Sequence, residues 1–347
     1  MPSRSVRFDG QPLFDISSYA RRGPGRRDHL SPAEIDRVAR TVRRTPEVMI
    51  KVLSRGGPDL KAVRRHLDYL RDREEGELAI ETDDGERLTG PGLAKSIIED
   101  WNLDLQEHQH RSDLDGRGRH STKLVHKLMF SMPAGTPPQK VLEAVKNFAR
   151  EEFALKHRYV MVLHTDEPHP HVHMVVKAVS EQGERLHIRK ATLRGWRQEF
   201  ARHLRALGVP ANATARSIRG QNRTAKLDGI YRAEQRGESW RVRARTKQVG
   251  REAFSGRLRT EPGKETLIET RGAVERGWWA VSEILAAQGL RELANEVRQF
   301  VGQMPLPRTD REMIAAERVN EFGTPGVMRL ERKQVSSRVV SSPFSVD

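Results

Sequence analysis

The stretch from His164 to His173 constrains this chain more than any other segment. It reads His-Thr-Asp-Glu-Pro-His-Pro-His-Val-His, so four histidines fall within ten residues, whereas the whole chain has 13. Apolar, β-prone runs lie on both sides of it, which predicts two antiparallel strands joined by a short proline-containing connection. Because side chains alternate along a strand, His171 and His173 point to the same face. The preceding strand ends at His164 and brings a third imidazole to that face, which predicts a metal site.

The amino-acid composition indicates what kind of molecule the protein binds. The 347 residues include 62 lysines and arginines against 47 aspartates and glutamates, and the net charge of +15 favours a polyanion such as nucleic acid. Cysteine is absent, which excludes disulfides and thiolate metal ligands. No apolar run approaches the roughly 20 residues of a membrane-spanning helix, and the first residues lack the apolar core of a signal peptide. We therefore expect no membrane insertion and a cytoplasmic protein.

Hydrophobic periodicity predicts an α+β fold, an antiparallel sheet with helices packed on one side. Strands are expected at Val48–Leu53, at Lys123–Met132, on both sides of the histidine stretch and at Leu186–Ile188. Helices are expected at Ser31–Arg44, Asp59–Arg73, Gly92–Trp101, Gln139–Phe153 and Leu193–Leu207. Apolar residues at helical spacing from Gly277 to Val301, and a further helix near Asp310–Phe322, predict a mainly α-helical C-terminal region.

One tyrosine is placed for contact or chemistry. The helix expected at Asp59–Arg73 has an apolar stripe made of Leu60, Val63, Leu67 and Leu70. Tyr69 is off that stripe, whereas a tyrosine that fills the core would lie on it. A phenolate next to a metal ion can attack a phosphodiester while the metal polarises a non-bridging oxygen. The energy of the broken bond is then kept in a phosphotyrosine, so the strand can be rejoined.

These residues resemble the HUH endonucleases, whose histidine–hydrophobe–histidine element matches His171–His173. The full stretch from His164 to His173 resembles the third motif of relaxases, the mobilization nucleases of conjugative plasmids and of T-DNA transfer. His66–Leu70 resembles their nucleophile motif, and Ser131–Gly135 resembles the end of their second motif. The segment Gly208–Arg216, followed by Arg219-Gly220, is similar to the basic segment that closes the catalytic domain in the T-DNA branch. The resemblance implies an HUH endonuclease fold with a palm-like sheet.

The resemblance also implies roles for the matched residues. Tyr69 corresponds to the nucleophile, and Asp166 to an acidic residue that orients a histidine or helps to deprotonate the tyrosine. The ligands of a divalent cation, Mg²⁺ or Mn²⁺, correspond to His164, His171 and His173. Imidazole also suits later metals, so Zn²⁺ and Ni²⁺ are expected to bind in vitro.

Other matched residues are expected to contact DNA or support the site. Ser131 corresponds to a serine that binds the DNA backbone, and His169 either contacts phosphate or caps the turn. A basic tract on and after the last helices of the catalytic domain fits a groove for single-stranded DNA. Its predicted DNA-binding residues are Arg185, Arg189, Lys190, Arg194, Arg197, Arg216, Arg219 and Arg223.

The implied function is that of a DNA relaxase. Such an enzyme nicks one strand at an origin of transfer, forms a 5'-phosphotyrosine and later rejoins the strand, which initiates conjugative transfer. The implied partners are single-stranded DNA at the origin, relaxosome accessory proteins and a type IV secretion coupling protein. Export into a recipient cell while joined to DNA is also implied.

Two other classes of function fit parts of the pattern. A rolling-circle replication initiator or transposase of the HUH class usually places its tyrosine after the histidine pair, where Tyr231 is the only tyrosine. A non-enzymatic DNA-binding protein would instead use the histidines for a structural metal, with His169 as a fourth ligand.

Four segments are expected along the chain. Residues 1–46 form a basic N-terminal extension, and residues 47–222 form the relaxase domain. Residues 223–333 form a basic, mainly helical accessory region, and residues 334–347 form a disordered tail.

Overall fold

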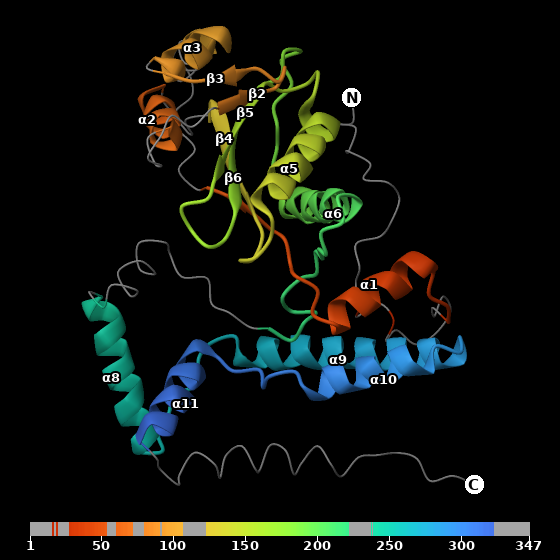
Figure 1. The fold of residues 1–347 in the computed structure, drawn as a ribbon. Coiled ribbons are helices and arrows are strands. Elements are labelled where there is room, and N and C mark those ends of the chain that lie inside the picture. The colour runs from red at the N-terminus through yellow and green to blue at the C-terminus, as the bar shows by residue number, and fades with distance from the viewer. Residues whose placement is uncertain are drawn as a thin grey trace. The chain divides into compact units, whose positions relative to one another are not determined.

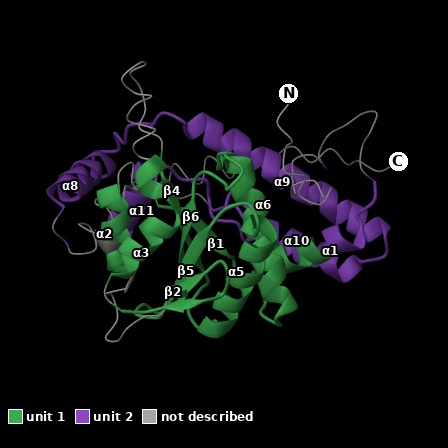
Figure 2. Cartoon of the chain, turned by 90° about the horizontal axis from the view of Figure 1, so that it is seen from above, with its two compact units in different colours: residues 1–14, 36–214 green, residues 15–35, 215–347 purple. Residues whose placement is uncertain are grey.

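The structure is a computed structural model that describes residues 28–53, 60–71, 80–90, 92–106, 123–221 and 239–322, together with residues 16, 19 and 237. The chain forms two compact units (Figure 2): residues 1–14 and 36–214 make unit 1, and residues 15–35 and 215–347 make unit 2. The predictions for Arg223, Tyr231 and residues 334–347 lie outside the described residues.

Unit 1 is built on a six-stranded antiparallel sheet with the strand order β1-β4-β6-β5-β2-β3 (Figure 1). The strands are β1 (Met49–Val52), β2 (Ile80–Thr82), β3 (Arg87–Leu88), β4 (Val125–Ser131), β5 (Tyr159–His164) and β6 (His171–Lys177). The two histidine-bearing strands pair with His164 opposite His171, and the next strand pairs with Ser131 opposite His171. The predicted α+β fold with an antiparallel sheet is confirmed.

One face of the sheet is covered by α5 (Pro138–Phe153) and α6 (Lys190–Ala206), which pack on an aromatic core (Figure 1). Phe130 of β4 lies at its centre, with ring centroids 5.2 Å from Phe148 and 5.4 Å from Phe200. Val172 of β6 is fully buried in the same core. This face holds apolar side chains from alternate residues of each strand, as a half-buried strand requires.

The other face is covered by α2 (Leu60–Arg71) and α3 (Leu93–Asp100). The predicted stripe of α2, represented by Val63, Leu67 and Leu70, is buried there against Val160 and Val162 of β5. The expectation that the helices pack on one side of the sheet is therefore wrong. The remaining residues of the alternating strands are also apolar over part of their length, so the sheet offers a second surface to an amphipathic helix.

Two local elements differ from the prediction. The short strands β2 and β3 form a hairpin in a segment where no strand was expected, and Gly85 in its turn has a φ of 89°. The strand expected at Leu186–Ile188 is reduced to an isolated bridge between Val179 and Arg185. His126 of β4 bonds the carbonyl of Leu186 at 3.0 Å, so a side chain occupies an acceptor that a sheet partner would use.

Unit 2 is mainly helical, as predicted. Its helices are α8 (Trp240–Phe254), α9 (Lys264–Ala287), α10 (Arg291–Gly302) and α11 (Asp310–Phe322); α1 (Pro32–Val42) begins in this unit. Trp278 and Phe300 join α9 to α10, with ring centroids 5.3 Å apart. Among the described residues, no helix is both long and apolar enough to cross a membrane.

A segment from near the N-terminus completes unit 2. Gly277 of α9 lies so close to the chain that a Cβ atom there would be 2.1 Å from the carbonyl oxygen of Ile16, so only glycine fits. Gln288 follows α9 and bonds the backbone of Leu30 twice, accepting from its N–H at 2.9 Å and donating to its carbonyl at 3.0 Å. The residues expected to form one N-terminal extension, 1–46, are thus divided between the two units.

Candidate active site

Three histidines converge at one end of the sheet. His164 is the last residue of β5, and His171 and His173 lie at the start of β6. Val172, between the last two, points into the α5–α6 core, so its two neighbours face α2. All three side chains are buried, with at most 5% of their surface exposed, and their potential ligand atoms lie within 4.8 Å of one another. The predicted convergence on one face is confirmed.

Hydrogen bonds to backbone carbonyl groups orient two of the rings. The carbonyl of His169 accepts from Nδ1 of His171 at 3.0 Å, which directs Nε2 of that ring toward the cluster. The carbonyl of Leu70 accepts from Nε2 of His164 at 3.1 Å, which leaves Nδ1 as the ligand atom. Nδ1 of His164 and both ring nitrogens of His173 are shielded from solvent. Neutral imidazoles held in this way fit a divalent cation.

Tyr69 lies beside this cluster. It is in the last turn of α2, and 45% of its surface is exposed while the apolar stripe next to it is buried. The bond between His164 and the carbonyl of Leu70 ties the residue after Tyr69 directly to the cluster. The sheet and α2 therefore bring the candidate nucleophile and the candidate metal ligands to the same face.

His66 is a residue whose role the sequence did not reveal. Its ring stacks on Tyr69, with centroids 6.2 Å apart and an interplanar angle of 16°, and meets the edge of His173 at 6.3 Å. Burial, together with the charges of the nearby Lys127 and His164, lowers the pKa of His66 to about 3. His66 is neutral at physiological pH and fills the space between the tyrosine and the histidines. Its position three residues before Tyr69, on the same helix face, was the signal available in the sequence.

Lys127 is a second residue that sequence reasoning did not assign. It lies on the α2 face of β4, is 5% exposed, and donates from Nζ to the carbonyl of Ala62 in α2 at 3.3 Å. The contact holds α2 on the sheet. It also keeps the positive charge of Lys127 close enough to His66 to act on it. Such a charge favours an anionic substrate near it.

The other predicted site residues lie at different positions around the histidine cluster. The Asp166 carboxylate is 4.0 Å from Nε2 of His171, on the ligand side of that ring. Ser131 is opposite His171 in the sheet and 8% exposed. The His169 ring is exposed and outside the histidine cluster, although its carbonyl orients His171.

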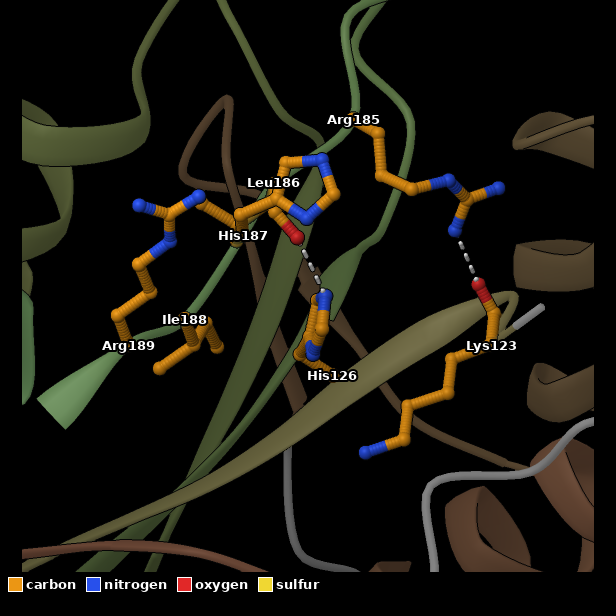
Figure 3. Close-up of a pocket in the computed structure, with 7 residues that line it drawn as sticks. All are labelled: Lys123, His126, Arg185, Leu186, His187, Ile188 and Arg189. Atoms are coloured by element: carbon orange, nitrogen blue, oxygen red, sulfur yellow. Dashed lines mark hydrogen bonds between the residues drawn. The ribbon is translucent and has the colours of Figure 1, made fainter. Parts of the chain in front are cut away.

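Part of the predicted basic tract lines a separate pocket of about 320 Å³ (Figure 3). Arg185 donates to the carbonyl of Lys123 at 3.0 Å, and His187 and Arg189 line the pocket with it. His126, also in the lining, is five residues before Ser131, so the pocket is about 17 Å along β4 from the histidine cluster. His126 alternates with Lys127, so its side chain is on the opposite face of the sheet.

The other arginines are dispersed. Lys190 and Arg194 are exposed on α6, whereas Arg197 donates to the carbonyl of Ile50 at 2.9 Å and so helps hold α6 on β1. Arg216 and Arg219 belong to unit 2, where they line a second pocket with Arg308.

Comparison with known proteins defines the class of this site. Residues 74–209 match the family described as relaxase, MobA/VirD2-like, nuclease domain. The resemblance inferred from the sequence is thus confirmed: this part of the chain is similar to the MobA/VirD2-like relaxase nuclease domains. Tyr69 lies just before the matched region, and all three histidines lie within it.

A curated relative adds a particular protein to that class. The chain is 25% identical over 185 residues to the T-DNA border endonuclease VirD2 of Rhizobium radiobacter. The aligned region covers 50% of this chain and 43% of the relative, so the chain spans less than half the length of the protein that it matches. No solved structure matches the chain.

Proposed function

We propose that this protein is a DNA relaxase that nicks one strand by tyrosine transesterification. The observation that carries the proposal is the bond between His164 and the carbonyl of Leu70, which joins the tyrosine-bearing turn to the three-histidine cluster. Further support comes from the relaxase nuclease-domain match. In the proposed reaction the Tyr69 oxygen forms a bond to phosphorus, and the bond to the 3' oxygen breaks. The products are a 5'-phosphotyrosine and a 3' hydroxyl, and the reverse attack rejoins the strand.

His164, His171 and His173 would hold a divalent cation, for which we propose Mg²⁺ or Mn²⁺. When bound, it polarises a non-bridging phosphate oxygen and stabilises the charge of the transition state. The carbonyl groups of Leu70 and His169 fix the ring orientations that this binding requires. Ser131, at the same end of the sheet, is proposed to bind the DNA backbone.

Asp166 is proposed to act on the ligand side of His171. The His169 carbonyl already holds Nδ1 of that ring, so Asp166 is not needed to fix its tautomer. From its position near Nε2 the carboxylate can accept the phenolic proton or add an oxygen donor for the cation. An added oxygen would suit Mg²⁺, which prefers oxygen ligands.

The biological setting is proposed from the relative and the family. The substrate would be single-stranded DNA at an origin of transfer, and the partners would be relaxosome accessory proteins and a type IV secretion coupling protein. Nicking would take place in the cytoplasm, with export of the protein joined to DNA. Within unit 1, the pocket with Arg185 and Arg189 would hold DNA far from the scissile phosphate, because it lies at the other end of β4.

The test is a covalent adduct. Single-stranded oligonucleotides that tile the DNA flanking the gene are incubated with the protein and Mg²⁺, and adducts are resolved on denaturing gels. We expect an adduct from the unmodified protein, none from Tyr69→Phe, and a normal yield from Tyr231→Phe. Loss with Tyr231→Phe alone would instead support a replication initiator or transposase. DNA binding without any adduct across the tiled set would support a structural metal in a non-enzymatic protein.

A further inference from the structure

Helix α8 of unit 2 presents two very different faces. One face packs on α11, where Val249 and Ala253 are buried with Ala315. The opposite face carries a row of exposed residues spaced by three or four positions, which places them on one side of a helix. We call this row the α8 stripe; it consists of Trp240, Arg243, Lys247, Arg251 and Phe254.

The stripe has an aromatic ring at each end and three cations between them. Trp240 is 70% exposed and Phe254 is 50% exposed, which is unusual for side chains of this size. Arg241 lies 5.8 Å from the centre of the Trp240 ring and adds a fourth positive charge at that end. With a rise of 1.5 Å per residue, the two rings are about 21 Å apart along the helix.

The two faces of α8 differ in whether their charged side chains form ion pairs. Toward α11, Arg245 pairs with Glu261 at 2.7 Å and with Asp310 at 3.3 Å, and Arg311 pairs with Glu252. Within the part of the chain that the structure describes, the three cations of the stripe form no ion pair. The inner face is thus neutralised by the fold, whereas the outer face keeps its positive charge for another molecule.

We propose that the α8 stripe binds single-stranded DNA. Exposed aromatic rings offer stacking surfaces to unpaired bases, and the cations between them can follow the phosphates of the same strand. A duplex would use the cations but not the rings, because its bases are already stacked. The proposal rests on the proposed function only in that the bound strand would be the one that the nuclease domain cleaves.

A membrane surface fits this helix less well. A helix that lies in a membrane interface has cations on one face and a broad apolar face opposite, which enters the lipid. In α8 the apolar face is already buried against α11, and the exposed rings share one face with the cations. The arrangement is that of a nucleic-acid platform.

The test compares two sets of charge changes of equal size in the full chain. Tyr69→Phe serves as the background, so that binding is measured without covalent capture. The stripe variant carries Arg243→Gln, Lys247→Gln and Arg251→Gln. The matched control carries Arg276→Gln, Arg291→Gln and Arg298→Gln, three exposed cations on α9 and α10 of the same unit.

Binding is followed by the anisotropy of a labelled oligothymidylate of about 20 nucleotides while salt is raised from about 50 to 200 mM. We expect the stripe variant to lower the log–log salt slope by about 2, at about 0.7 per lost phosphate contact, and the control to change it much less. Trp240→Ala with Phe254→Ala should weaken binding by about 10-fold or more and leave the slope nearly unchanged. Thermal melting of all variants checks that each is folded.

Three results would overturn the proposal. Equal loss in the stripe variant and its control would show that only net charge matters. A matched duplex that loses as much affinity as the single strand when the rings are removed would exclude stacking on unpaired bases. Binding to anionic phosphatidylserine vesicles that depends on the stripe, with no effect on oligonucleotide binding, would assign the stripe to a membrane.

Failure of the α8 stripe to bind DNA can be distinguished from failure of the protein to act as a relaxase. Adduct formation on a short oligonucleotide at saturating concentration is measured with Tyr69 intact, and the stripe variant should give a normal yield there. A protein that forms no adduct at all would fail as a relaxase, while the anisotropy experiment would still decide on the stripe.

Discussion

The two faces of the sheet in unit 1 are built from alternate residues of the same strands, yet they have opposite character at one end. On the α5–α6 face, Phe130 and Val172 continue the aromatic core to the strand ends. On the α2 face, the apolar surface ends at Val162 and Val175. The positions beyond them, toward the same end of the sheet, are His164, His171 and His173. A strand thus supports a packed core and a polar site at adjacent residues, because the pleat separates them.

The contrast also explains why the polar face tolerates burial. Buried imidazoles are costly without partners, and here the carbonyl groups of Leu70 and His169 bind two of the rings. At this end of the sheet the α5–α6 face is apolar and needs no such hydrogen bonds, since its stability comes from apolar area removed from water.

The largest effect is expected from His173→Ala, on the α2 face. Loss of one of three ligands both weakens metal binding and misplaces the cation, so cleavage should fall by about 100-fold or more. The rate of adduct formation with Mn²⁺ measures this, and the stabilisation by Mn²⁺ in thermal melts should disappear. Activity within a few-fold of normal would remove His173 from the ligand set.

The adjacent Val172→Ala changes the opposite face. Removal of two buried methyl groups should lower the free energy of unfolding by about 2 kcal/mol, and the cavity left behind adds to the cost. Urea unfolding measures the loss, whereas adduct formation by the folded variant should stay near normal. A large catalytic loss without destabilisation would show that the two faces are not independent.

A histidine on the α5–α6 face offers a test by pH. Burial lowers the pKa of His126 to about 4, so the unfolded chain takes up a proton below about pH 6.5 before the folded chain does. The free energy of unfolding should therefore fall as the pH drops from about 6.5 to 4. His126→Gln should remove about 1 kcal/mol of that fall, measured by urea unfolding at both ends of the range. An unchanged pH profile in the variant would contradict the assignment.

The smallest effect is expected from His169→Ala. The carbonyl that orients His171 belongs to the backbone, and the exposed ring lies outside the cluster. Adduct formation should drop by less than about 5-fold, well short of the loss of a ligand. A loss equal to that of His173→Ala would make His169 a fourth ligand and favour a structural metal.

The sequence predicted the residues of the site better than the contacts that hold them in place. Strand alternation was enough to bring His171 and His173 to one face, and the stripe of α2 was enough to expose Tyr69. The bond from His164 to Leu70 joins residues 94 apart in sequence, and no local pattern encodes such a contact. His66 was visible in the motif, but its place between Tyr69 and His173 depends on how α2 crosses the sheet.

The fold was predicted in its main elements and missed at its edges. The hairpin of β2 and β3 has an Asp84-Gly85 turn, a recognised hairpin signal, but the strands around it are short and partly polar. The helices on both faces follow from Val160, Val162 and Val175, which give each strand two apolar sides. A continuous apolar run of this kind is the expected mark of a strand covered on both faces.

The hydrogen bonds between Leu30 and Gln288 can form only late in the synthesis of the chain. These two residues are 258 positions apart, so the ribosome makes one partner long before the other. Residues 36–214, which belong to the other compact unit, are synthesised in the meantime. Unit 2 cannot close until α9 and Gln288 have been made, and closing such a long loop is slow. All six strands of the sheet in unit 1 are therefore synthesised before the segment at Leu30 can meet its partner.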